Sequence, residues 1–289
     1  MIPSMKFAII DVGSNSVRLM LWADGKTLYK KIITTRLGEN LAESNVLSES
    51  AIERTLAAIQ TFCKEAKTED ARIFAFATAA VRSAKNRAEF CKRVKENCKI
   101  ELDVVSGSEE AQLGIFGALG NADGGIIDIG GASTELCFRK GGATVFSESI
   151  DIGAVLLFDL CKDDKRKLTE KIKQKLFLID GINLAGNICA IGGTASTLAS
   201  IKLGLKKYDP NKLQHVRLTV RWVEETAERL LSMTVSERKQ ISGMDPSRAD
   251  VIAGAAYLLS EIMKTICCES VAFSDRDNLE GYLAVRGLV

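Results

Sequence analysis

The sequence predicts an α/β protein built from two similar domains. Its length of 289 residues suits two domains of ordinary size. The segment Ile9–Leu19 reappears 117 positions later as Ile126–Leu136, which indicates two similar half-molecules. Strand-like and helix-like segments alternate in both halves, as is typical of α/β proteins. We place the boundary in the turn-rich segment 121–125, giving domains over 1–122 and 123–289 and leaving the last helix free to pack back on the first.

In the first half, an apolar strand reaches an Asp, turns through Gly and small hydroxyl residues, and resumes as a second apolar strand. This pattern predicts a β-hairpin, and the second copy of the repeat predicts another. Ser50 and Glu53 form the pattern of a capping box at the start of a helix. The other elements expected here are a strand at 73–77, a helix at 86–98, a strand at 100–105, and a helix at 108–119 capped by Ser106 or Ser108.

In the second half, Asp245 and Pro246 predict the N-cap and first residue of a long helix, whose apolar stripe runs from Ile252 to Met263. The other elements expected are a basic helix at 165–178, a strand at 188–191, a helix from about Ala195, a helix from near Thr219, a strand at 271–273 and a helix at 278–285.

Composition narrows the classes of function. The 39 basic and 37 acidic residues nearly balance, so no overall charge favours nucleic acid or a membrane surface, and an anionic ligand must be held locally. No apolar stretch approaches the roughly 20 residues that span a bilayer, and no secretory segment opens the chain; we expect a cytoplasmic protein. The eight cysteines form no Cys-x-x-Cys and His215 is the only histidine, which favours buried thiols over disulfides or zinc.

Three glycine-rich turns are candidate phosphate-binding sites. Such turns bring backbone N–H groups close to a ligand, and a following helix N-terminus adds a positive dipole end. A single turn of this kind is usually only a turn, but three, two of them duplicated as Asp-x-Gly, favour phosphate. They are Gly13-Ser14-Asn15-Ser16, Gly130-Gly131-Ala132-Ser133 and Gly192-Gly193-Thr194.

Six motifs follow one another nearly end to end along the chain: Asp11–Leu19, Ala77–Arg82, Ser106–Leu113, Asp128–Glu135, Gly192-Gly193-Thr194 and Arg248–Ile252. In their order and spacing they resemble the exopolyphosphatase / guanosine pentaphosphate phosphohydrolase (Ppx/GppA) family. The resemblance implies the actin-like ATPase (ASKHA) fold, with two ribonuclease H-like domains facing each other across a cleft. It also implies hydrolysis of a terminal phosphoanhydride with Mg²⁺.

Two departures from the family pattern concern the proposed ligand contacts. Ala132 stands where the second turn usually has a third glycine, which places a methyl group near the phosphates. The segment Ser274–Gly281 lacks the usual Gly-Leu-Arg run, which puts a ligand role for this end of the chain in doubt.

Glu110 resembles the family's catalytic carboxylate, which orients and deprotonates the attacking water. The alternative is that Glu109 and Glu110 are only first-turn acids favoured by the helix dipole. The resemblance favours the catalytic interpretation for Glu110.

Asp128 and Glu135 lie seven residues apart across the predicted hairpin and are expected to serve catalysis by holding Mg²⁺ through hard oxygen ligands. Asp11 is the symmetric candidate, although Asp at such a turn is often only a backbone hydrogen-bonder. Arg18 takes the position of Glu135 in the first copy. Arg18 and Arg82 are expected to bind phosphate, with surface ion pairs as the alternative.

The basic segment 162–175 could form a polyanion track, but interspersed acids favour a solvated helix face. We expect an exopolyphosphatase that removes the terminal phosphate of inorganic polyphosphate, with pppGpp (guanosine pentaphosphate) as the alternative substrate of the same pocket. A homodimer is possible. The rivals are an actin-fold small-molecule kinase and a non-catalytic binder of polyphosphate or alarmone.

Overall fold

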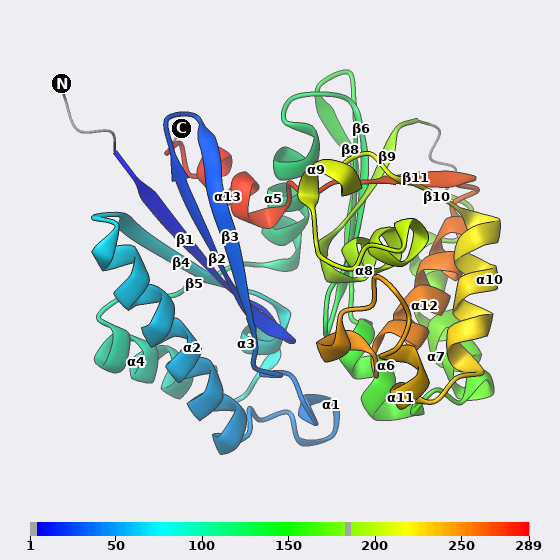
Figure 1. Cartoon of the computed structure of the whole chain (residues 1–289), viewed down its shortest axis with the longest axis horizontal. Coiled ribbons are helices and arrows are strands. Elements are labelled where there is room, and N and C mark those ends of the chain that lie inside the picture. The colour runs from blue at the N-terminus through cyan, green and yellow to red at the C-terminus, as the bar shows by residue number, and fades with distance from the viewer. Residues whose placement is uncertain (1–4, 183–185, 289) are drawn as a thin grey trace. The chain divides into compact units, whose positions relative to one another are not determined.

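The computed structural model describes residues 5–182 and 186–288 (Figure 1). The described chain divides into two compact units, of which the first holds residues up to Glu110 and those from Tyr282 onward, and the second holds Ala111–Gly281. The first division falls within helix α5 (Gly107–Leu119), ahead of the boundary predicted at 122–123. The second falls within helix α13 (Asn278–Val285). The first unit therefore includes the end of α13.

The first unit contains a five-stranded mixed sheet in the order β3-β2-β1-β4-β5. Strand β1 pairs with β2 in antiparallel fashion and with β4 in parallel. The elements are β1 (Phe7–Val12), β2 (Ser16–Ala23), β3 (Lys26–Thr34), α1 (Leu41–Ser44), α2 (Glu49–Thr68), β4 (Arg72–Ala77), α3 (Ala79–Ser83), α4 (Arg87–Cys98) and β5 (Asp103–Val104).

Alternation along the strands gives this sheet two apolar faces. Ala8 and Ile10 of β1 belong to the same core cluster as Phe62 of α2, which packs beside α4 (Figure 1). On the opposite face, Phe76 of β4 stacks on Tyr282 with ring centroids 4.9 Å apart. Residues from the end of the chain thus complete the second face of the sheet.

The start of α2 differs from the predicted capping box. The N-cap is Ser48 rather than Ser50, and the Ser48 hydroxyl accepts a hydrogen bond from the Ala51 N–H at 3.3 Å. Only Ser50 has a Glu three residues later, but Ser48, two residues earlier, is the residue that caps the helix. Strand β3 was not predicted, because this strand at the sheet edge has no regular alternation of buried and exposed side chains.

The second unit contains a six-stranded mixed sheet in the order β10-β11-β9-β6-β7-β8. The predicted α/β class is thus confirmed in both units. The elements are β6 (Gly124–Ile129), β7 (Thr134–Lys140), β8 (Ala143–Ile150), α6 (Ala154–Cys161), α7 (Lys165–Leu176), β9 (Ile188–Ile191), α8 (Gly192–Leu203), α9 (Pro210–Leu213), β10 (Arg217–Thr219), α10 (Val220–Leu231), α11 (Val235–Arg238), α12 (Ile252–Thr265) and β11 (Ser270–Phe273).

Two helix starts in this unit differ from the predictions. Asp245 caps the short 3-10 helix Pro246–Arg248, and α12 itself begins at Ile252. Helix α8 begins at Gly192, without a connecting turn after β9. In the described part of the chain, no helix is both long and apolar enough to cross a membrane.

Helices α5 and α13 approach each other through glycines within the second unit. A Cβ on Gly117 would lie 1.8 Å from the carbonyl oxygen of Asp277, and a Cβ on Gly281 would lie 1.8 Å from that of Leu113. Neither position can accept a methyl group unless a helix backbone moves. The two glycines therefore set how closely α13 can approach α5.

Replacing Gly281 with Ala should destabilise the protein by about 1–3 kcal/mol or more, because the new methyl group meets backbone atoms that cannot rotate away. The exposed Ala284→Ser on the same helix is the control. Thermal unfolding of both variants measures the effect. An unchanged midpoint for Gly281→Ala would show that the helices separate at little cost.

Candidate active site

The two hairpins of the repeat place an Asp opposite a different partner in each unit. In the register of β1 and β2, Asp11 faces Arg18, and in that of β6 and β7, Asp128 faces Glu135. Both turns are closed in the same way: the Gly13 N–H donates to the Ser16 carbonyl, and the Gly130 N–H to that of Ser133, each at 3.0 Å. Since directly opposite residues project from the same face, the first hairpin joins an acid to a cation and the second joins two acids.

In the first unit, Arg18 binds Asp11 through two nitrogens. Its Nε and Nη2 lie 2.9 and 2.5 Å from Asp11 Oδ2, and the Asp11 side chain is 5% exposed. The carboxylate is thus already neutralised by a cation. Of the three predicted metal ligands, Asp11 is therefore the least suited to a divalent ion.

The first turn is held from outside by the chain that follows β3. The carbonyl of Asn15 accepts hydrogen bonds from the N–H groups of Thr35 and Arg36, and that of Ser14 accepts one from Gly38. The Asn15 side chain is buried, yet within residues 5–182 and 186–288 neither of its amide atoms has a hydrogen-bond partner. Since such groups are costly to bury unpaired, this amide is suited to binding a polar ligand.

The second turn is held by helix α6. The carbonyls of Gly130 and Gly131 accept hydrogen bonds from Ala154 and Val155, at the start of that helix. Gly153 permits this approach, because a Cβ there would lie 2.7 Å from the Gly131 carbonyl. The turn is therefore fixed by backbone hydrogen bonds at its outer side.

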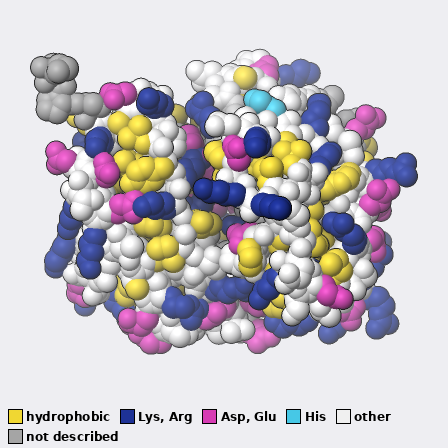
Figure 2. Space-filling view, viewed as in Figure 1, with side chains coloured by type: hydrophobic (Ala, Val, Ile, Leu, Met, Phe, Trp, Pro, Cys, Tyr) yellow, Lys and Arg dark blue, Asp and Glu magenta, His cyan; other side chains and the backbone are white. Residues whose placement is uncertain are grey.

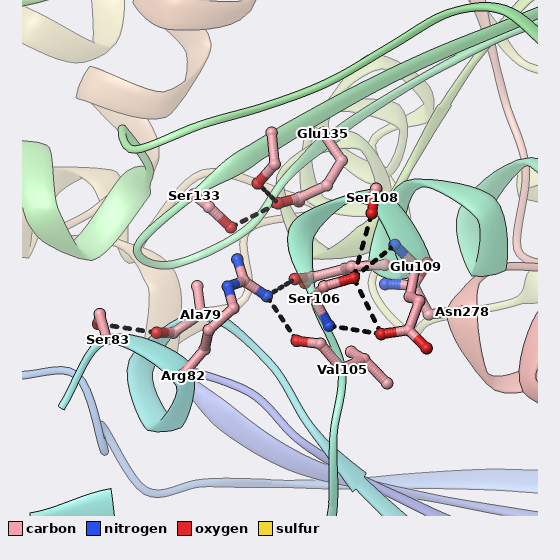
Figure 3. Close-up of polar contacts among 12 residues, drawn as sticks. Ala79, Arg82, Ser83, Val105, Ser106, Ser108, Glu109, Ser133, Glu135 and Asn278 are labelled. Carbon is pink, nitrogen blue, oxygen red and sulfur yellow. Dashed lines mark hydrogen bonds and ion pairs between the residues drawn. The ribbon is translucent and has the colours of Figure 1, made fainter.

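Glu135 is held by two hydroxyl groups. Ser133 Oγ and Ser149 Oγ donate to Glu135 Oε1 at 2.6 and 2.7 Å, and Figure 3 shows the bond from Ser133. Glu135 is 1% exposed. Hydrogen bonds from hydroxyls stabilise the ionised form of a buried carboxylate.

Asp128 lies between the glycines at the start of α8, where the third glycine turn was predicted, and α13. Asn278 Nδ2 donates to Asp128 Oδ2 at 3.2 Å, and a Cβ on Gly192 would lie 2.4 Å from Asp128 Oδ1. Gly192 also has a positive φ of 76°, which a residue with a side chain rarely adopts. Thr194 Oγ1 donates to the Ile129 carbonyl at 3.1 Å, so this turn is tied to the end of β6.

Arg248 is a cation that the sequence analysis quoted in a motif but gave no role. A Cβ on Gly193 would lie 2.0 Å from Arg248 Cζ, so the guanidinium lies directly over this glycine. Fifty-five residues separate the two along the chain, and no local signal predicts the contact.

The two adjacent acids of α5 have different surroundings. Glu109 forms a capping box with Ser106: its Oε2 accepts from the Ser106 N–H at 2.8 Å, and its own N–H donates to Ser106 Oγ at 3.2 Å (Figure 3). These hydrogen bonds, that from the Ser106 N–H first, lower the pKa of Glu109. Glu110 is 6% exposed and takes no part in this cap. The helix-cap interpretation therefore applies to Glu109.

Glu110 forms an ion pair with Arg82. Arg82 Nη1 lies 2.8 Å from Glu110 Oε2 and also donates to the Val105 carbonyl at 3.1 Å. Arg82 lies in the last turn of α3. Both arginines predicted to bind phosphate thus contact a predicted site carboxylate.

The predicted metal ligands belong to different units, Asp11 to the first and Asp128 and Glu135 to the second. Across the residues that the structure describes, no three His, Cys, Asp or Glu side chains form a metal-binding group. Asp128 and Glu135 nevertheless fit a hard divalent cation, because two buried carboxylates directly opposite each other repel and a cation relieves that repulsion.

The predicted basic helix is α7, which buries Leu168, Ile172 and Leu176 and exposes most of its lysines. Lys165 pairs with Glu228 at 2.6 Å. Figure 2 shows Lys and Arg interspersed with Asp and Glu across the visible face of the molecule. The exposed lysines and the Lys165–Glu228 ion pair support the interpretation of α7 as a solvated helix face.

A family model described as the Ppx/GppA phosphatase family matches residues 22–285. The chain belongs to this family. The membership confirms the resemblance predicted from the sequence and the enzyme class that came with it, the phosphoanhydride hydrolases.

Relatives within this family support the same conclusion. The chain is 27% identical to Exopolyphosphatase 2 of Mycobacterium tuberculosis, with 96% of this chain and 97% of that protein covered. It is 29% identical to the bifunctional 3-dehydroquinate synthase/phosphatase of Fusobacterium nucleatum, covering 95% of this chain but spanning only 45% of that protein's length. The crystal structure of a Ppx/GppA family member from Aquifex aeolicus matches with a TM-score of 0.80 at 27% identity, covering 99% of this chain and 98% of that one. The match confirms that the chain has the fold of the Ppx/GppA family, with a mixed sheet in each of its two units.

Replacing Glu109 with Gln should lower the free energy of unfolding by roughly 0.5–1 kcal/mol at pH 7, because the capping box loses its charge. A carboxylate whose pKa is lowered by folding stabilises above its unfolded pKa, ordinarily about 4.3, and loses that effect as pH falls through its folded pKa. The difference between wild type and variant should therefore shrink from pH 7 to pH 3. Urea unfolding at several pH values measures it, and a difference independent of pH would show that the charge is not responsible.

Proposed function

We propose that this protein removes the terminal phosphate of inorganic polyphosphate. The observation that carries the proposal is the duplicated hairpin turn, which bears Asp11 with Arg18 in one copy and the paired acids Asp128 and Glu135 in the other. A chain of phosphoanhydrides needs both kinds of partner, cations for its phosphate oxygens and acids that can hold a divalent ion. The similarity to Exopolyphosphatase 2 supports polyphosphate as the substrate class.

Phosphate binding is assigned to the three turns and their neighbouring cations. In the first unit, the turn Gly13–Ser16 offers backbone and hydroxyl groups together with the buried amide of Asn15. In the second, Gly192 and Gly193 open helix α8 with Arg248 beside them. A helix N-terminus with an adjacent guanidinium is a favourable environment for an anion. The remaining predicted contributors are Arg18, Arg82, Gly130, Gly131, Ser133 and Thr194.

Asp128 and Glu135 are the residues that would hold Mg²⁺. When bound there, a divalent ion neutralises negative charge on the phosphate oxygens and polarises the bond to be broken. Two serine hydroxyls donate to Glu135, which favours its ionised form, and the Asn278 amide donates to Asp128. The first hairpin has an arginine in the equivalent position, so we assign its Asp11 to positioning Arg18.

Glu110 is the proposed general base. Its carboxylate is buried and uninvolved in the helix cap, and Arg82 fixes its orientation through Oε2. A carboxylate held in this way can orient the attacking water and accept its proton as the water oxygen bonds to the terminal phosphorus. The leaving group is the oxygen of the shortened chain.

The test of this function is phosphate release measured in parallel from polyphosphate of several lengths, pppGpp and ATP with an acceptor. Release from polyphosphate at the highest kcat/KM is expected. Preferential release from pppGpp would assign the alternative substrate, and transfer of phosphate to an acceptor would indicate a kinase. Binding without turnover would contradict catalysis altogether.

Glu110→Gln should lower kcat for polyphosphate at least 100-fold while substrate binding persists, because the neutral amide cannot accept the proton of the attacking water, whereas the phosphate contacts remain. The adjacent Glu109→Gln, which alters a helix cap on the same turn, is the matched control and should keep kcat within about threefold. Steady-state phosphate release and a separate binding measurement give the two quantities. Equal kcat values for the two variants would return Glu110 to a structural role.

Asp128→Asn or Glu135→Gln should raise the Mg²⁺ concentration needed for half-maximal activity, and EDTA should abolish wild-type activity. Asp123→Asn is the control: this carboxylate precedes the same hairpin and accepts hydrogen bonds only from the turn at Gly141 and Gly142 among the contacts described. Full activity in EDTA would rule out the metal assignment.

A further inference from the structure

Asn278 is a buried residue of α13 that the sequence analysis gave no role. It is 3% exposed, and its amide nitrogen lies 3.2 Å from Oδ2 of Asp128, 150 residues earlier in the chain. An ionised carboxylate can only accept hydrogen bonds, so the amide must present its N–H₂ group to it. In this contact Asn278 is therefore the hydrogen-bond donor and Asp128 the acceptor.

The position of Asn278 is fixed by the start of its helix. Asp277 and Glu280 hold the first turn of α13. The Asp277 N–H donates to Glu280 Oε2, and Asp277 Oδ1 accepts from the Leu279 N–H, both at 3.0 Å. Asn278 is the first residue of α13, between these two acids. The amide therefore has little freedom to turn away.

Helix α5 limits the other side of the Asn278 amide. A Cβ on Gly114 would lie 3.1 Å from Asn278 Oδ1, so the carbonyl end of the amide is packed against this glycine. Together with the contacts of Gly117 and Gly281, this packing holds α13 at one distance from α5. The amide nitrogen is thereby directed at Asp128.

We propose that Asn278 is a positioning residue that orients the Asp128 carboxylate for the divalent cation. The proposal rests on the proposed function, because it takes Asp128 to be a metal ligand. An amide donor leaves the carboxylate ionised, as a ligand must be. On the opposite side, Gly192 leaves the space that Asp128 Oδ1 occupies. Losing the amide would remove one of the contacts that orient the carboxylate and would weaken cation binding more than the chemical step.

A purely structural role for Asn278 makes a different prediction. If the amide only completes the start of α13, its loss would lower stability and leave the affinity for Mg²⁺ unchanged. Metal affinity measured without substrate therefore separates the two roles, since ligand-orienting residues typically contribute 10- to 100-fold to it.

The experiment titrates the full chain with Mg²⁺ alone by calorimetry. Asn278→Leu, of similar size but without a donor, should raise the Kd for Mg²⁺ about 10-fold, while kcat at saturating Mg²⁺ stays within about threefold. Asn278→Ala should behave alike and serves if the larger side chain prevents folding. Ser274→Ala is the matched control, because it removes only the bond from Ser274 Oγ to the Arg276 carbonyl just before α13.

The outcomes distinguish this proposal from the function on which it rests. Wild-type Kd values for both Asn278 variants, with Mg²⁺ still bound and required, would overturn the role of Asn278 and leave the metal assignment standing. No Mg²⁺ binding by wild type would overturn the metal assignment itself. A weaker Kd in Ser274→Ala equal to that of Asn278→Ala would show that general loosening of this segment is responsible, which also contradicts the proposal.

Discussion

The register of the two hairpins is the constraint on which the candidate site depends. Each turn is closed by one hydrogen bond from a glycine N–H to a serine carbonyl, and this bond fixes which residue faces the Asp. A slip of one residue would send every side chain of the strand to the other face. Because the closure is the same in both copies, a single difference in sequence, Arg18 against Glu135, changes the first hairpin from an acid pair to an ion pair.

The surroundings of the turns explain why small residues gather there. In the first unit the returning chain donates to the carbonyls of Ser14 and Asn15, and in the second the start of α6 donates to those of Gly130 and Gly131. Rigid backbone support of this kind prepares a site before its ligand arrives. The close approaches of Gly153 and Gly192 extend the same support, since side chains there would displace the turn or Asp128.

The sequence predicts those parts of the fold and the site that have local causes. The repeat, the turns and most helices follow from periodicity within about twenty residues. The caps of α2 and α12 were predicted wrongly: Ser48 caps α2 without the Glu of a capping box, and Asp245 caps a short 3-10 helix that precedes α12. Helix position alone gives Glu109 and Glu110 the same dipole advantage, so only the family resemblance separated them in the sequence. In the structure the capping box engages Glu109.

Arg248 and Asn278 were beyond sequence reasoning for a different reason. Their partners lie 55 and 150 residues away, and each of the two side chains packs against a glycine distant in the sequence, Gly193 for Arg248 and Gly114 for Asn278. In the sequence, Gly193 is typical of a turn, and Gly114 is a residue that lowers helix stability. In the structure, Gly193 leaves space for the Arg248 guanidinium and Gly114 for the Asn278 amide. Asp128 and Glu135 lie on strands β6 and β7. Gly193 of α8 and Gly114 of α5 set how closely Arg248 and Asn278 can approach. Packing of the second unit and the chemistry of Asp128 are therefore coupled through the same few backbone contacts.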